Sequence, residues 1–514
     1  MDWKQVKYDA IVVGSGATGS TAARWLTKGG ANVLLLEAGP ELPMASCGPT
    51  EKSAEEFNAL KIRQPIQSRS LLYDRKNCHL FVDDLDNPYE THSGTTFNWI
   101  RSRQAGGRTL VWSRFALRMS EQDLGAASEE LPETGWPVPY RDLAPYYDQI
   151  ETLARIYGTV ERIPSLPDGR FLPRRMSPYL GVLRERLTDR FPNRHLLPSR
   201  EVVDHQGGRV GAPPSSSSLG SMLLHAARER LTFHTNCVVA KIELDRPDHA
   251  DRVVFVDRSN QRWYEVTGRV IVLCASTIES TRILLASVSR HFPTGLGNSS
   301  GALGHYLMDH FGGPRIVALG KITGVEPASH ESAYIPRFCN IGGRTEEFSR
   351  GYGIQAHFEA QSHGQLILTM GVFGEVLPYF ENGIELEPSI TDACGVAVPK
   401  ISFRYRDNEH RMAIHAQRTL REVTEALGFR PMIAHDELLA PGTRAHELGG
   451  ARMGSSPENS VLNRFNQCWD VKNLFVTDGA CFPTAGDKGP TLTMMALTAR
   501  ACDHILRSLR SGAL

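Results

Sequence analysis

Three glycines and one glutamate near the start of the chain have the types and spacing of a dinucleotide-binding site. Gly14, Gly16 and Gly19 form the pattern G-x-G-x-x-G, and Glu37 follows them at close to the roughly 20 residues typical of an acid that binds a ribose. Gly14 permits a tight turn, Gly16 removes a side chain where a pyrophosphate approaches the backbone, and Gly19 lets helix and strand pack closely. The chemistry they indicate is the binding of a nucleotide cofactor.

These residues need particular elements around them, and the sequence supplies each one. Residues 10–13 are a short apolar run that predicts a buried strand, and residues 20–27 predict a helix whose N-terminus offers N–H groups and a positive dipole end to phosphates. Residues 33–36 predict a second buried strand that ends at Glu37. A glycine pattern alone could be an ordinary turn, and this context is what favours the nucleotide site.

The bulk composition bounds the partners and the compartment. The 514 residues carry 57 basic and 57 acidic side chains, so no basic excess exists to hold a nucleic acid. No apolar run approaches the roughly 18 residues of a membrane span, and residues 1–7 leave no room for a signal peptide. Nine scattered cysteines without C-x-x-C indicate buried reduced thiols. We expect a cytoplasmic protein, although export with a signal-bearing partner is left open.

The elements predict a mixed α/β (α+β) chain of two domains. A second strand and helix at 269–287 follow the first pair by more than two hundred residues, which indicates a discontinuous, Rossmann-like domain at 1–310 and 441–514 with excursions at 41–90 and 160–214. Alternating apolar residues at 311–440 predict a substrate-binding domain with an antiparallel sheet and flanking helices, one of them capped by Asn408 and ended by Gly428. Residues 232–244 are expected to form one strand.

The chain resembles the glucose–methanol–choline (GMC) oxidoreductases, which are FAD enzymes, nearly from end to end. The matching segments are 14–39, Gly106–Gly107, 297–310, 446–454, 473–484 and 489–493, and the C-terminal segments are the most specific. Within that family the chain is most similar to bacterial pyranose oxidases, glycoside 3-dehydrogenases and C-glycoside 3-oxidases.

The resemblance implies a role for each matching residue. The ADP half of FAD would be held by Gly14, Gly16, Thr18, Gly19 and Glu37, with Val239 contacting adenine through its backbone. Gly106, Gly107 and Thr109 would lie along the flavin, Asp478 and Gly479 would meet the pyrophosphate and ribityl chain, and Pro490 and Thr491 would meet the pyrimidine edge. His446 would face the flavin N5 across the substrate.

The reaction that the resemblance implies is the oxidation of an alcohol. FAD accepts the hydride, and the protein must supply a base for the hydroxyl proton. A histidine, with a pKa near 6.5, suits that task at neutral pH. On residue type alone His446 would be an ordinary turn or surface histidine, and its place in His446-x-x-Gly449 to Arg452-Met-Gly454 is what favours the catalytic role.

Three departures from the family pattern matter. The family usually places Asn or His where this chain has Gly489, so His446 acts alone or is helped by Lys488, Asp487 or water; an exposed loop lysine is the plainer reading of Lys488. Val111 stands where some relatives attach FAD to a histidine, which predicts non-covalent FAD. No closely spaced cysteines could hold an iron–sulfur cluster, so we expect no metal.

The expected activity is the oxidation of a secondary hydroxyl of a sugar or glycoside, at C3 or C2 of a pyranoside, to a ketone. Gln355, His357 and Glu359 share one face of a strand and would bind sugar hydroxyls if that face looks at the flavin, or form a solvated face if it does not. The alternatives are oxidation of an aldonate, polyol or aromatic alcohol, and a flavin-binding subunit with reduced activity. Oxygen or another electron acceptor, a small partner subunit and a homo-oligomer are all left open.

Overall fold

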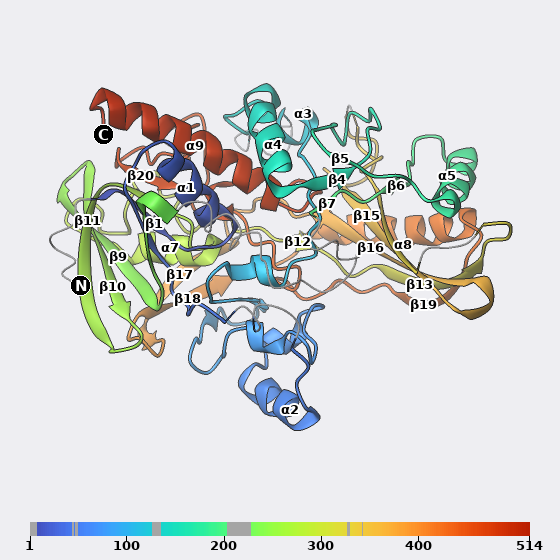
Figure 1. Ribbon diagram of the computed structural model, residues 1–514, viewed down its shortest axis with the longest axis horizontal. Helices are drawn as coiled ribbons and strands as arrows, with labels where there is room; N and C mark the ends of the chain where they lie inside the picture. The colour runs from blue at the N-terminus through green and yellow to red at the C-terminus, as the bar shows by residue number, and fades with distance from the viewer. Residues whose placement is uncertain are drawn as a thin grey trace.

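Two seven-stranded sheets lie at opposite ends of the long axis of the molecule (Figure 1). The computed structural model describes residues 8–43, 46, 50–125, 135–202, 228–325, 329–341 and 343–514. Helices flank both sheets, so the mixed α/β class with a Rossmann-like part and an antiparallel part is confirmed.

The first sheet carries the glycine fingerprint. Its parallel strands lie in the order β8 (Leu231–His234), β2 (Val33–Leu36), β1 (Tyr8–Val13), β11 (Arg262–Leu273) and β20 (Leu474–Val476). β9 (Cys237–Arg246) and β10 (His249–Asp257) extend it as an antiparallel meander with the first half of β11. The central strands are buried except at Asp9, as expected of a parallel sheet covered on both faces. Helices α1 (Ala17–Lys28) and α9 (Thr491–Ser511) pack against each other beside it, and α7 (Thr277–Ala286) contacts β9.

The second sheet is antiparallel. Its strands lie in the order β19 (Arg430–His435), β13 (Arg315–Lys321), β16 (Gln365–Glu375), β15 (Tyr352–Ala360), β14 (His330–Ile335) and β6 (Leu197–Pro198), with β12 (His310–Phe311) paired to β16. Buried and part-exposed residues alternate along β16, so one face is covered. Helices α8 (Asp407–Ala426) and α5 (Pro178–Arg190) lie on this sheet's side of the molecule (Figure 1).

Shorter elements complete the described chain. They are α2 (Ala54–Arg63), η2 (Gln67–Arg69), η3 (Cys78–Leu80), β3 (Glu90–Thr91), η4 (Gly107–Leu110), α3 (Glu121–Gly125), α4 (Tyr140–Ala154), β4 (Ile156–Gly158), β5 (Leu172–Pro173), β7 (Glu201–Val202), η6 (Arg228–Arg230), η7 (Ser362–Gly364), β17 (Gly383–Thr391), β18 (Ala397–Ser402) and η8 (Gly479–Cys481).

Two local expectations were wrong. The single strand expected at 232–244 is two, because the backbone turns at Asn236, whose φ is +62°, and β8 and β9 then take different partners. Asn408 does not cap α8, because its Oδ1 accepts a hydrogen bond from the Ser349 N–H. The helix begins at Asp407, and its N-cap is Arg406, whose N–H donates to Glu409.

The domain division stays a prediction, and some contacts cross its boundaries. β6 lies in the excursion 160–214 yet pairs with β14 of the second sheet, while β17 and β18, at 383–402, contact α7 of the nucleotide side. Residues 203–214 of that excursion lie outside the described residues.

Candidate active site

A cavity of about 830 Å³ is lined by residues of both sheets, a volume within the range of about 300–1,000 Å³ of small-molecule and cofactor sites. Three helices begin at this cavity: α1 is capped by Gly16, α7 by Ser276 and α9 by Pro490, and all three capping residues line it. The first turn of a helix presents unpaired N–H groups and a positive dipole end. The cavity is therefore suited to a ligand that carries phosphates.

The glycine fingerprint has the geometry that a pyrophosphate needs. Gly14 has a φ of +93°, and a Cβ there would lie 2.5 Å from the Cys274 carbonyl oxygen. A Cβ on Gly19 would lie 1.7 Å from the carbonyl oxygen of Gly14, so this glycine allows helix and strand to pack. A Cβ on Gly16 would meet nothing within 4 Å, and Gly107 lies opposite, its own Cβ position 3.3 Å from the Cα of Gly16. The bare backbone of Gly16 thus faces the cavity.

Glu37 lies at the end of β2 with its carboxylate buried beside the fingerprint. Its Oε2 accepts hydrogen bonds from the backbone N–H of Ser15 at 2.9 Å and the Ser15 hydroxyl at 2.6 Å, and Oε1 accepts from the N–H of Gly39 at 2.8 Å. Burial raises the pKa of Glu37 although these donors oppose the shift. The carboxylate is held in place at the edge of the cavity, where a ribose hydroxyl could share it.

Val239 lines the same end of the cavity and is held by an arginine. The guanidinium of Arg282 donates to the carbonyl oxygens of Val239 and Ala240, at 2.5 and 3.1 Å, and its Nε donates to Glu279 at 2.7 Å. This fixes the backbone that the resemblance assigns to adenine.

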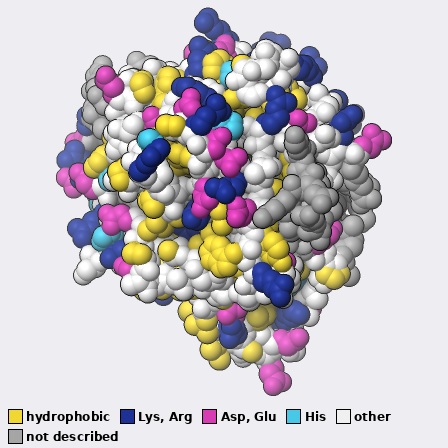
Figure 2. All heavy atoms as spheres, turned by 90° about the vertical axis from the view of Figure 1, so that its left-hand side faces the viewer, with side chains coloured by type: hydrophobic (Ala, Val, Ile, Leu, Met, Phe, Trp, Pro, Cys, Tyr) yellow, Lys and Arg dark blue, Asp and Glu magenta, His cyan; other side chains and the backbone are white. Residues whose placement is uncertain are grey.

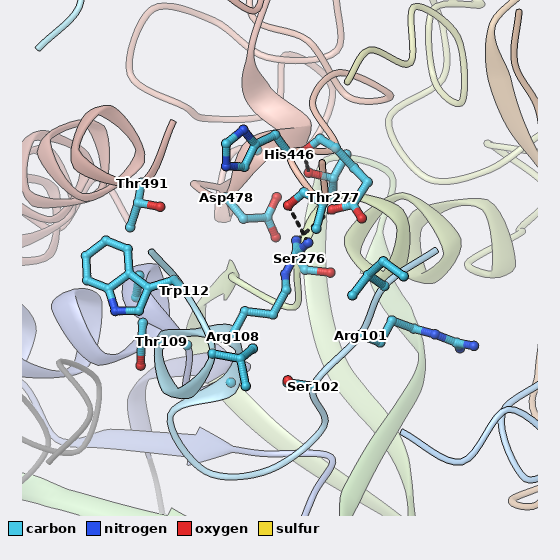
Figure 3. Close-up of a pocket in the computed structure, with 18 of the residues that line it drawn as sticks. Arg101, Ser102, Arg108, Thr109, Trp112, Ser276, Thr277, His446, Asp478 and Thr491 are labelled. Carbon is cyan, nitrogen blue, oxygen red and sulfur yellow. Dashed lines mark hydrogen bonds and ion pairs between the residues drawn. The ribbon is translucent and has the colours of Figure 1, made fainter. Parts of the chain in front are cut away.

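His446 also lines the cavity, where it is half-buried (Figure 3). Its backbone N–H donates to Asp309 Oδ1 at 3.0 Å, and its ring meets the His310 ring edge-on at a centroid separation of 5.0 Å. The ring Nδ1 is buried and has no hydrogen-bond partner among the described residues, which leaves Nε2 for a ligand. Burial, with the nearby His310, Arg108 and Arg444, lowers the pKa of His446 well below its usual value, so the ring is neutral and able to accept a proton.

Arg108 joins the η4 turn to the segment that carries His446 (Figure 3). Its Nη1 donates to the carbonyl oxygen of Ala445 at 2.6 Å, and its Nη2 lies 2.7 Å from Glu447 Oε2. The two residues that flank His446 are thereby fixed from the opposite wall of the cavity.

Lys488 does not lie where the sequence suggested. It is 1% exposed, not on an exposed loop, and does not line the cavity. Its ammonium forms ion pairs with Asp123, at 2.8 Å, and Asp487. Asp123 also lies 3.6 Å from Arg337, which makes a buried charge network behind the segment that leads to Gly489.

The structure brings most of the predicted site residues to one cavity. Those that line it are Gly14, Gly16, Thr18, Glu37, Gly107, Thr109, Val239, Gln355, His357, His446, Asp478, Gly479, Pro490 and Thr491. Gly19, Gly106, Glu359 and Lys488 do not line it. Lining residues that sequence reasoning missed include Arg108, Trp112, Phe115, Glu201, Phe373 and Arg444, and only Trp112 carried a signal, as the aromatic residue next to Val111.

Further expectations concern metal ions, membrane spans, surface charge and the linkage of the flavin. In the part of the chain that the structure describes, no three His, Cys, Asp or Glu side chains are grouped to hold a metal ion, and no helix is long and apolar enough to cross a membrane. Basic and acidic side chains are interspersed on the face shown in Figure 2. Val111 lines the cavity and offers no nucleophile for a flavin bond. The absence of metal and the non-covalent cofactor stay predictions.

Comparison with known proteins identifies the cofactor and the family. A family profile described as FAD dependent oxidoreductase matches residues 9–288, and one described as GMC oxidoreductase matches residues 378–498. Relatives include 2-methyl-1,2-propanediol dehydrogenase of Mycolicibacterium austroafricanum, 27% identical over 97% of this chain and 95% of the relative. C-glycoside 3-oxidase of Arthrobacter globiformis is 24% identical over 98% and 96%.

The fold has a solved counterpart. The crystal structure of pyridoxine 4-oxidase from Mesorbium loti superposes with a TM-score of 0.64 at 18% identity, covering 97% of this chain and 99% of that one. The chain belongs to the GMC family of FAD-dependent oxidoreductases and acts on CH–OH groups of small molecules.

Proposed function

We propose that this GMC oxidoreductase oxidises a secondary hydroxyl of a sugar or glycoside, at C3 or C2 of a pyranoside, to a ketone. The observation that carries the proposal is that His446 lines the same cavity as the polar side chains of Gln355 and His357. A substrate with several hydroxyls fits these polar side chains better than an apolar alcohol does, because buried polar groups need hydrogen-bond partners.

The residues divide the work in this proposal. FAD, when bound, accepts the hydride from the carbon. The Nε2 of His446 takes the hydroxyl proton, and Asp309 and Arg108 hold the backbone around His446 in place.

A second candidate is the oxidation of another alcohol, such as an aldonate, a polyol or an aromatic alcohol. The relative named for 2-methyl-1,2-propanediol favours it, since that substrate is a small diol. A third candidate, a flavin-binding subunit with reduced activity, is favoured by Gly489, which has no side chain to assist His446.

One experiment separates the three candidates. The purified protein is mixed anaerobically with a panel of pyranosides, polyols, aldonates and aromatic alcohols, and bleaching of the flavin absorbance is followed. The proposal expects fastest bleaching with a pyranoside; a polyol, aldonate or aromatic alcohol ahead of it supports the second candidate, and no bleaching supports the third.

The same proposal includes FAD held without a covalent bond, an electron acceptor that is oxygen or another oxidant, and work in the cytoplasm, alone, as a homo-oligomer or with a small partner subunit. Acid precipitation that leaves the flavin with the polypeptide would contradict the non-covalent part.

A further inference from the structure

Beyond His446 the cavity ends in a wall of four polar side chains from three strands. We call Glu201 of β7, Ser332 of β14, and Gln355 and His357 of β15 the distal polar wall; all four line the cavity. Ser332 lies opposite His357 in the β14–β15 register, and its hydroxyl is 3.0 Å from His357 Nδ1. The wall is therefore built on paired strands rather than on a loose loop.

Phe115 links this wall to the catalytic end. Its ring meets the His357 ring edge-on at 6.0 Å, and its backbone forms an antiparallel bridge with Glu201. Its carbonyl oxygen lies 3.9 Å from the Cβ position of Gly489, which is itself 3.9 Å from His446 Cε1. A substrate bound at His446 is therefore beside Phe115, whose backbone pairs with Glu201.

Glu201 is the member of the wall whose carboxylate is only partly satisfied: it accepts a hydrogen bond from the Ser332 side chain, but one oxygen has no partner in the described part of the chain. Its side chain is 8% exposed, and Oε1 is buried without a hydrogen-bond partner among the described residues. Arg174 Nη1 is 3.8 Å from that oxygen, beyond hydrogen-bonding distance. Burial raises the pKa of Glu201 to about 7, against the pull of Arg174 and Arg114. A buried acceptor without a donor is costly, so the site is built to receive one.

The charges around Glu201 favour a neutral donor. Arg174 and Arg114 are the basic groups that act on it, and Glu331 is the acidic one. Two positive side chains therefore face Glu331 and Glu201, and a pKa of about 7 leaves Glu201 only partly ionised at neutral pH, so no excess negative charge exists to pair with an ammonium group. A hydroxyl can donate to the Glu201 carboxylate without adding charge.

We infer that Glu201 accepts a hydrogen bond from a substrate hydroxyl other than the one oxidised, and so selects neutral polyhydroxylated rings over small diols. The inference rests on the proposed function and deepens it. A ring that bridges His446 and the distal polar wall meets polar groups at both ends, with Phe115 between them. A small diol at His446 leaves Glu201 without its donor and gains nothing from it.

The test compares two substrates in two variants of Glu201. Anaerobic flavin reduction is measured by stopped flow with a methyl pyranoside and with 1,2-propanediol, for the wild type, Glu201→Ala and Glu201→Gln. We expect Glu201→Ala to lower the second-order rate of reduction by the pyranoside by roughly 10–100-fold, the range expected for a lost hydrogen bond to a charged group. Its rate with the diol should stay within about twofold of the wild type, and Glu201→Gln, which keeps a carbonyl acceptor, should lose less.

Glu331→Gln is the matched control, because Glu331 is also buried and close to Glu201 but does not line the cavity. Flavin content and the thermal midpoint check that each variant is folded. Equal losses with both substrates, or no loss with the pyranoside in a wild type that oxidises it, would overturn the role of Glu201 while leaving the proposed function standing. A preference for an amino sugar that Glu201→Gln abolishes would overturn the choice of a neutral hydroxyl. A wild type that oxidises the diol but no pyranoside would overturn both.

Discussion

Gly489 lies directly beside the ring of His446: a Cβ on this glycine would stand 3.9 Å from His446 Cε1. That distance is an ordinary van der Waals contact, and among the described residues other than its chain neighbours only the carbonyl oxygen of Phe115, also at 3.9 Å, lies as near. A Cβ at this position, where the resemblance implies Asn or His, therefore fits beside the proposed base without a clash, and the Lys488 ammonium is ion-paired elsewhere.

Gly489→Asn should be tolerated. We expect full FAD content and a flavin reduction rate within about tenfold of the wild type, a difference of about 1.4 kcal/mol in the barrier. Gly486→Asn is the matched control: Gly486 has a φ of +69°, and a Cβ there would lie 2.6 Å from the Met119 side chain. That variant should be less stable, because the buried Met119 side chain must move to admit the new side chain, and overpacking an interior typically costs about 1–3 kcal/mol. A Gly489→Asn protein that unfolds as easily as Gly486→Asn would show that the space is not free.

The rate of flavin reduction at saturating substrate should stay constant as the pH falls to 6.5. His446 must be neutral to accept a proton, and its pKa is lowered well below the usual value, so protonation removes the base only in more acidic solution. The measurement is a stopped-flow pH profile, repeated in Glu201→Gln because Glu201 has a pKa of about 7. A loss of rate centred at or above pH 6.5 in both proteins would mean that the His446 ring is not held neutral.

Glu37→Ala should weaken FAD binding by about 1.5–3 kcal/mol, the contribution of a hydrogen bond to a charged group, or roughly 10–150-fold in Kd. The variant loses the acceptor for the ribose and leaves the Ser15 N–H without its partner. Glu37→Gln keeps one carbonyl acceptor and should bind more tightly than Glu37→Ala. Titration of the apoprotein with FAD, followed by flavin fluorescence, measures both, and an unchanged Kd in Glu37→Ala would remove Glu37 from the site.

Lys488→Met should destabilise the fold by about 3–5 kcal/mol, because the buried carboxylates of Asp123 and Asp487 lose the ammonium that they share. Arg421→Met is the control: Arg421 pairs with Asp436 at 2.6 Å, but both side chains are 47% exposed, and such pairs contribute about 0–1 kcal/mol. Denaturant unfolding of the holoproteins compares them. Equal stability of the two variants would mean that Lys488 is not a structural ion-pair partner.

Local signals allowed the nucleotide half of the site to be predicted. Gly14, Gly16 and Gly19 owe their roles to turn geometry and close packing within about 25 residues of Glu37, so the pattern and its result lie together in the sequence. Helix α2 also had a local signal in the sequence, because Ser53 and Glu56 form a capping box at its N-terminus. Residues 41–90 were nevertheless expected to be an excursion, and no helix was predicted there.

The substrate half depends on contacts between distant segments. Lys488 is buried because it pairs with Asp123, which lies 365 positions away in the sequence. No pattern near Lys488 predicts that partner. Glu201 reaches the cavity only through pairing of β7 with β4 and its bridge to Phe115. Gln355 and His357 were placed on one face by strand periodicity, but only the tertiary structure decides that this face lines the cavity.

The most direct test of the account is the rate of anaerobic flavin reduction in His446→Ala. The variant should fold, keep FAD and retain the wild-type spectrum, since the ring packs against His310 and Phe373 without a hydrogen bond from Nδ1 among the described residues. Mixed with the best pyranoside in a stopped-flow instrument, it should reduce its flavin roughly 10²–10⁴-fold more slowly than the wild type, the usual contribution of a general base. A His446→Ala protein that reduces its flavin at the wild-type rate would contradict the assignment of His446 as the base.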